Sequence, residues 1–237
     1  MPQRSIFKIV KSACVWTMWA SVLASHHLDP LTLLWIASAY VGAYSFDQSK
    51  HPMVWIPSLT YTVLYPCVQA DRWTVLVIVA LLASIPWYTW IKRITVWAKS
   101  LYLMIQFVAM VVVLPQMVSP NVDVVWDEGL VINSLLIAST LAFWSGWNDR
   151  LDRTLDRDAG IKTPYNTFTT QTMLIVQLCN ALCTFVAASW LPDRTVRLGL
   201  WILSCVRAMA VTSDRHWYET GGGWELGIVA LLCVRVP

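Results

Sequence analysis

The chain has 237 residues, of which 57% are hydrophobic and only 13% are charged, and its formal net charge is +3. Soluble domains carry roughly 25% charged residues, so this composition excludes an ordinary water-soluble protein, and so small a net charge gives no support for nucleic-acid binding. The 15 tryptophans point the same way, because indole rings favour the membrane interface. We therefore expect one integral membrane domain over residues 1–237, with membrane lipid around it.

Apolar runs separated by short polar breaks predict the transmembrane segments. The runs do not alternate between apolar and polar residues, which favours helices over the strands of a barrel. A helix needs roughly 20 apolar residues to cross a bilayer, and several runs are shorter. The sequence predicts an all-α, polytopic helical bundle of about nine transmembrane helices, at 12–28, 31–46, 53–69, 73–90, 100–118, 129–147, 168–191, 196–213 and 223–234.

The distribution of basic residues predicts the orientation of this bundle. If the chain crosses at every run, the N-terminus and every second break share one side, and 13 of the 17 Lys and Arg lie there. The positive-inside rule places that side in the cytoplasm. We therefore expect a multi-pass protein, in a cell inner membrane, whose second and sixth runs both end on the cytoplasmic face.

The six cysteines all lie inside apolar runs, and no two of them form a C-x-x-C pair. This pattern is typical of small buried hydrophobic residues and gives no support for a cysteine metal site.

An acidic segment, WNDRLDRTLDRDAGIKTP from Trp147 to Pro164, follows the sixth run. The spacing of Asp149, Asp152 and Asp156 places these carboxylates on one face of a helix. Because like charges repel, a positive group is expected among them, either a neighbouring arginine or a divalent cation. The alternative is a solvated helix end on which Asp149 pairs with Arg153 at i,i+4.

The residues that follow predict where this helix ends. Gly160 is expected to stop the helix, and Pro164 to prevent its restart. Arg157 and Lys162 would then lie on a segment that can fold back toward the carboxylates.

Further charged residues lie at the ends of other runs. Asp47 and Lys50 follow the second run, and Lys99 precedes the fifth. Ionisable groups at membrane depth are usually functional, although a helix end is easily hydrated, so a structural role for Asp47 is the alternative.

Carboxylates and basic residues at the mouth of an apolar bundle favour an amphiphilic diphosphate as the ligand. Mg²⁺ takes one or two protein carboxylates and completes its shell with phosphate oxygens, while Arg and Lys bind the remaining oxygens. The apolar interior would hold a hydrocarbon chain. The predicted metal ligands and catalytic residues are Asp149, Asp152, Asp156 and Asp47. The predicted contacts to the diphosphate are Asn148, Arg153, Arg157, Lys162, Lys50 and Lys99.

The segment DRTLDRDAGIKT, Asp152 to Thr163, resembles the second aspartate-rich motif of the UbiA superfamily of intramembrane prenyltransferases, which include 4-hydroxybenzoate polyprenyltransferases. That motif is D-x-x-x-D with a following basic residue, glycine and threonine. Read from Asn148, the same place also fits N-D-x-x-D-x-x-x-D, the form usual for the first motif. In the family the first motif follows the second span, where this chain offers only Asp47, so that motif is reduced.

The resemblance implies nine helices, a cytoplasmic catalytic mouth and two acidic motifs that close on a Mg²⁺-bound diphosphate. The implied activity is transfer of an isoprenyl group from a prenyl diphosphate to a lipophilic or aromatic acceptor. Two alternatives stay open: a terpene cyclase of the same superfamily, and a non-catalytic membrane protein, either a transporter or a degenerate lipid-diphosphate binder.

Overall fold

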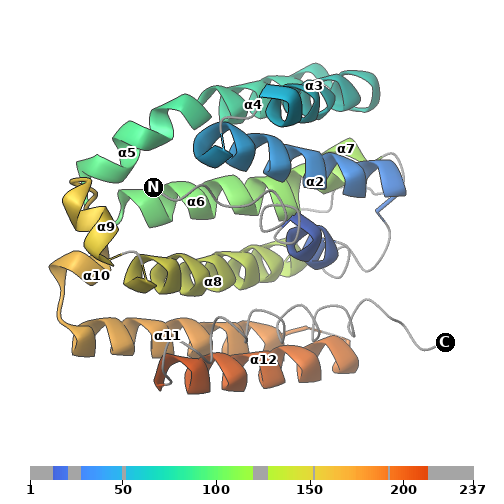
Figure 1. Ribbon diagram of the computed structural model, residues 1–237. Coiled ribbons are helices and arrows are strands. Elements are labelled where there is room, and N and C mark those ends of the chain that lie inside the picture. Colours follow the sequence, from blue (N-terminus) through green and yellow to red (C-terminus); the bar gives the residue numbers. More distant parts are fainter. Residues whose placement is uncertain are drawn as a thin grey trace. The chain divides into compact units, whose positions relative to one another are not determined.

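The computed structural model describes residues 13–20, 28–49, 52–119, 128–151, 153–191 and 193–212. Within these ranges every regular element is a helix, which confirms the all-α prediction (Figure 1). The chain forms two compact units, each considered by itself below. The first unit is Met1–Trp87 with Ala109–Trp126, and the second unit is Tyr88–Val108 with Asp127–Pro237.

The first unit is built around a pair of helices, α2 and α3. Its elements are α2 (Pro30–Tyr44), the π-helix η1 (Ser45–Ser49), α3 (Pro52–Gln69), α4 (Arg72–Ala83), the 3₁₀ helix η2 (Ile85–Trp87), the π-helix η3 (Ala109–Val113) and α7 (Leu114–Val118). α2 packs along α3 and α7 contacts both α2 and α4. The α2–α3 approach is close, since a Cβ atom added at Gly42 would lie 2.6 Å from Leu59 Cδ2.

The second unit is a layer of longer helices. Its elements are α5 (Tyr88–Ile94), α6 (Ala98–Val108), α8 (Glu128–Leu151), α9 (Arg153–Asp158), α10 (Pro164–Thr167), α11 (Thr170–Ser189) and α12 (Arg194–Thr212). α8 packs against α6 on one side and α11 on the other, and α12 lies along α11 (Figure 1).

A buried arginine joins three long helices of this unit, α8, α11 and α12. Arg207 on α12 is 2% exposed and donates hydrogen bonds to the hydroxyls of Thr140 on α8 (3.1 Å) and Thr184 on α11 (3.2 Å). Its guanidinium also lies over the Phe143 ring, 5.4 Å from the centroid. These contacts fix the rotational positions of α8, α11 and α12, because a buried guanidinium is costly without its partners.

Two helices in the described ranges are long and apolar enough to cross a membrane, Ala98–Val118 and Thr170–Ser189. Arg72–Trp87 and Glu128–Phe143 are apolar but shorter. The count of nine transmembrane helices is therefore not confirmed, and the predicted run 223–234 lies outside the described residues.

The outer surface of these helices is apolar. On α11, Ile175 and Leu182 are 61% and 60% exposed, as expected of side chains that face lipid or another apolar partner. The expectation that the cysteines are buried is wrong for five of them, because they lie on outward-facing sides of their helices: Cys14, Cys67, Cys179, Cys183 and Cys205 are exposed.

The predicted run 73–90 is not one continuous α-helix. α4 ends at Ala83, a 3₁₀ turn covers Ile85–Trp87, and α5 begins at Tyr88. Pro86 explains the break, because proline has no N–H to donate and its ring clashes with the preceding turn.

Candidate functional site

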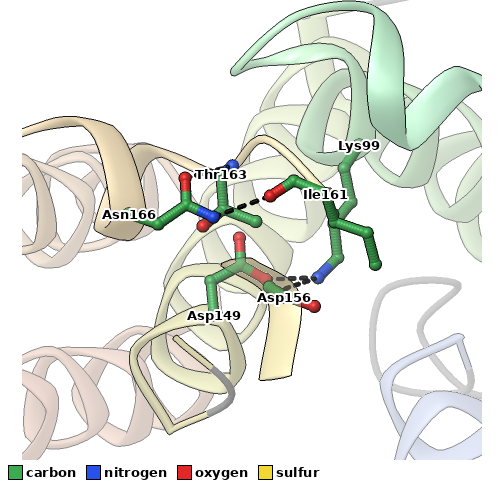
Figure 2. A network of polar contacts seen from close by, with 6 residues as sticks. All are labelled: Lys99, Asp149, Asp156, Ile161, Thr163 and Asn166. Atoms are coloured by element: carbon green, nitrogen blue, oxygen red, sulfur yellow. Dashed lines mark hydrogen bonds and ion pairs between the residues drawn. The ribbon is translucent and has the colours of Figure 1, made fainter. Parts of the chain in front are cut away.

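Two buried carboxylates and one lysine meet in the second unit. Asp149, in the last turn of α8, is 0% exposed, and Asp156 on α9 is 4% exposed. Lys99, in the first turn of α6, donates a hydrogen bond from Nζ to Asp149 Oδ1. The same ammonium lies 3.6 Å from Asp156 Oδ2 (Figure 2). Three helices thus contribute one charged group each to a single cluster, and the lysine on α6 lies 50 positions before Asp149.

The end of α9 has a structure that the sequence predicts well. Gly160 has a φ of +69°, a left-handed conformation that glycine adopts without strain. The N–H of Ile161 donates to the Asp156 carbonyl (2.8 Å), and the N–H of Gly160 donates to the Arg157 carbonyl (3.0 Å). These two bonds form a Schellman motif, so the predicted stop at Gly160 is confirmed and Asp156 is held in the last turn.

Asn166 joins the segment after this turn to the start of α10. Its Nδ2 donates to the Ile161 carbonyl (2.7 Å), and its Oδ1 accepts from the Thr163 N–H (3.0 Å) (Figure 2). The expectation that Pro164 prevents a helix restart is wrong, since Pro164 is the first residue of α10. Proline is tolerated there because the first N–H of a helix has no intrahelical partner.

Thr163 completes the polar surroundings of the carboxylates. It is 0% exposed, and its hydroxyl has no hydrogen-bond partner within the part of the chain that the structure describes. Figure 2 shows it beside Asn166, whose side chain accepts a hydrogen bond from the Thr163 N–H. A buried hydroxyl without a partner is uncommon and costs stability. Thr163 Oγ1 is therefore available to form a hydrogen bond with a ligand or a bound water.

The other side of Asp149 is closed by close packing between α8, α10 and α11. A Cβ atom at Gly146 would lie 1.9 Å from Gln177 Nε2 and 3.4 Å from Tyr165 Cε2, so a larger residue at this position would displace the Gln177 amide. Burial raises the pKa of the Tyr165 hydroxyl and the Asp149 charge adds to this, whereas a Gln177 hydrogen bond and the Arg150 charge oppose it. The hydroxyl therefore stays protonated at neutral pH.

The remaining predicted site residues fall into three groups. Arg153, Arg157 and Lys162 are exposed on α9 and the segment after it. Asp47 belongs to the first unit, where it is half-buried in η1. Lys50, Asp152 and the side chain of Asn148 lie outside the described residues, so their roles stay predictions.

Burial decides between the two interpretations of the acidic segment. The alternative of a solvated helix end is wrong for Asp149 and Asp156, since both are buried. Lys99 was expected to contact a diphosphate, but its pairing with the carboxylates could not be predicted, because it joins residues 50 positions apart and no local pattern specifies such a contact.

The two carboxylates could supply part of the coordination shell of a magnesium ion, but the protein does not supply a complete shell in the described ranges. Within the described ranges no group of three or more His, Cys, Asp or Glu residues is placed to share a metal. Mg²⁺ needs only one or two carboxylates when phosphate oxygens complete its shell. Asp149 and Asp156 already converge on one cation, the Lys99 ammonium.

Comparisons with models of protein families, with curated proteins and with solved structures found no match. The fold and the site by themselves define an all-α protein with helices able to cross a membrane and a buried Lys–Asp–Asp cluster.

Proposed function

We propose that this protein is a multi-pass membrane prenyltransferase of the UbiA type, which binds an isoprenyl diphosphate through Mg²⁺ at the buried cluster and transfers the isoprenyl group to a lipophilic or aromatic acceptor. The full set of about nine transmembrane helices, the cytoplasmic orientation of the cluster and its place in a cell inner membrane are parts of the same proposal.

The observation that carries the proposal is the convergence of Asp149, Asp156 and Lys99 in a buried place. Charged groups are expensive to bury, and three of them beside a partnerless hydroxyl suit a ligand that is itself charged. A Mg²⁺-bound diphosphate supplies both the cation for the carboxylates and the anion for the lysine. The apolar helices of this unit suit the hydrocarbon chain of the same ligand.

The chemistry requires the C–O bond of the isoprenyl diphosphate to break with its electron pair leaving on the diphosphate. Mg²⁺ bound at the site would withdraw charge from the leaving group. Asp149, Asp156 and Asp152 would hold the cation, while Lys99 and the exposed Arg153, Arg157 and Lys162 would bind the phosphate oxygens. The acceptor supplies the electron pair for the new bond to carbon and then loses a proton.

A second candidate is a non-catalytic membrane protein in which the cluster is purely structural. One observation favours it: the Lys99 ammonium already contacts both carboxylates, as in an ion triad that only joins α6, α8 and α9. Such a triad has no need of Mg²⁺ and leaves no role for the Thr163 hydroxyl.

Binding of farnesyl diphosphate to the purified protein distinguishes the two candidates. We expect binding to disappear in EDTA and to return with Mg²⁺, or with Mn²⁺ as a close substitute. Asp156→Asn should weaken it by about tenfold or more, because one charged ligand is lost. Asp158→Asn, which changes an exposed carboxylate on the same helix, is the matched control. Tight binding that ignores EDTA would contradict the proposal.

A further inference from the structure

The position of Lys99 suggests how the site responds to a metal ion. Its ammonium contacts a carboxylate from α8 and another from α9, which is the place that a bridging divalent cation would take between the same oxygens. Lysine and a divalent cation cannot both occupy it, because their positive charges repel at contact distance.

Lys99 has a route away from this place. Its side chain is 15% exposed, whereas those of Asp149 and Asp156 are 0% and 6% exposed. The lysine stem has four carbons and rotates freely, so its ammonium can move toward solvent without a shift of α6. The two carboxylates are fixed more firmly, since Asp149 lies in a long helix and Asp156 is followed directly by the Gly160 turn.

Thr163 gives an independent indication that a ligand belongs here. Its hydroxyl is fully buried and makes no hydrogen bond in the described ranges, and its side chain lies at the N-cap of α10, on the side of the Asn166 N–H. A hydroxyl so placed can bind a metal-bound water or a phosphate oxygen, and the ion triad alone does not use it.

We propose that Lys99 is an internal counter-cation: it holds the two carboxylates together until a divalent cation displaces it, and its ammonium then binds the diphosphate that arrives with that cation. This inference rests on the proposed function. It adds an order of events: the metal ion first displaces the Lys99 ammonium from the carboxylates, and the ammonium then binds the diphosphate.

Amine labelling of the unmodified protein tests this exchange directly. The purified chain is treated briefly with an acylating reagent, and the modification of Lys99 is measured by mass spectrometry relative to Lys92. We expect slow labelling in EDTA, labelling that is several-fold faster with Mg²⁺ alone, and slow labelling again with Mg²⁺ and inorganic pyrophosphate. Lys92, which lies over the Tyr88 ring at 5.3 Å, should keep one rate throughout.

Lys99→Met gives a second test, whose two effects have opposite signs. Removing the competing ammonium should tighten the binding of Mn²⁺ alone by about tenfold. Removing a phosphate ligand should weaken the binding of pyrophosphate in saturating Mg²⁺ by about tenfold. Lys92→Met is the control, and Thr163→Val should weaken metal binding without loss of folding.

The outcomes separate the inference from the function on which it rests. If Mg²⁺ and pyrophosphate bind but Lys99 labelling does not respond to Mg²⁺, the exchange is wrong and the diphosphate site stands. If neither Mg²⁺ nor pyrophosphate binds to the unmodified protein, the proposed function is itself wrong. The labelling arm needs no variant, so misfolding of Lys99→Met cannot hide either result.

Discussion

The carboxylate of Asp29 joins three segments of the first unit. It caps α2 by accepting hydrogen bonds from the N–H groups of Leu31 (2.9 Å) and Thr32 (3.1 Å). It also accepts from the hydroxyls of Tyr65 on α3 (3.4 Å) and Ser119 after α7 (3.2 Å). One side chain therefore satisfies a helix end and holds two neighbouring helices to it.

Asp29→Ala should lower stability more than the same change at another helix cap. We expect a loss of about 1–2 kcal/mol from the cap alone, with a further loss because the Tyr65 and Ser119 hydroxyls lose their acceptor. Asp71 is the matched control, since it caps α4 through Trp73 and Thr74 and no described tertiary hydrogen bond joins it to another helix. Thermal unfolding in detergent measures both, and equal losses would contradict this role.

The same carboxylate should make stability depend on pH. Burial acts to raise the pKa of Asp29, but hydrogen bonds from Thr32, Leu31 and Ser119 outweigh it and hold the pKa below its usual value. Its contribution is therefore complete above the unfolded pKa of about 3.9 and is lost as pH falls through the lower folded value. The stability difference between wild type and Asp29→Ala should shrink below about pH 4; a difference that grows on acidification would be the wrong sign.

At the scale of elements, the turn between α9 and α10 determines where Asp156 lies. The Schellman motif ends α9 at a left-handed glycine, and Asn166 then bonds to Ile161 and Thr163 in the segment that follows. The added Cβ of an alanine at Gly160 would meet nothing within 4 Å, so only the backbone conformation demands glycine there.

Gly160→Ala should destabilise the protein by about 1 kcal/mol, because an L side chain is strained at positive φ. Gly160→Asn is the matched control, since asparagine tolerates this conformation better than alanine, and it should cost less. Chemical denaturation of the two variants measures the difference. Equal stability of Ala and Asn variants would show that the conformation at residue 160 is not what the motif requires.

How far the sequence predicts these elements depends on the range of the interactions involved. The stop at Gly160 is specified by adjacent residues, and the sequence predicts it. The break at Pro86 also has a local cause. The sequence analysis did not predict it, because the apolar residues on both sides of Pro86 favour one continuous helix. Lys99 acquires its role only through a tertiary contact with Asp149, so the sequence identified the carboxylates and missed their pairing with this lysine.

At the scale of the whole molecule, the membrane assignment rests on apolar helices with exposed apolar side chains. α11 gives the sharpest case, because it is long and apolar enough to cross a membrane. The segment with Lys162 precedes it, and Asp193 follows it. If α11 crosses the bilayer, these two residues must lie on opposite sides.

Cysteine accessibility in intact cells tests this orientation. In a background without the native cysteines, Asp193→Cys should react with a membrane-impermeant thiol reagent and Lys162→Cys should react only after permeabilisation. The positive-inside rule gives this direction. Reaction of both in intact cells would show that α11 does not cross the membrane.

Release of pyrophosphate from geranyl, farnesyl and geranylgeranyl diphosphates is the measurement that tests the central claim most directly. With a membrane extract as the source of acceptor, we expect release by the purified protein in Mg²⁺ and none in EDTA. Asp149→Asn and Asp156→Asn should each slow release on the order of a hundredfold, while Asp158→Asn should leave it unchanged. Folded protein that releases no pyrophosphate from any of the three in Mg²⁺, or releases it equally in EDTA, would contradict the claim that the buried cluster is a metal–diphosphate site.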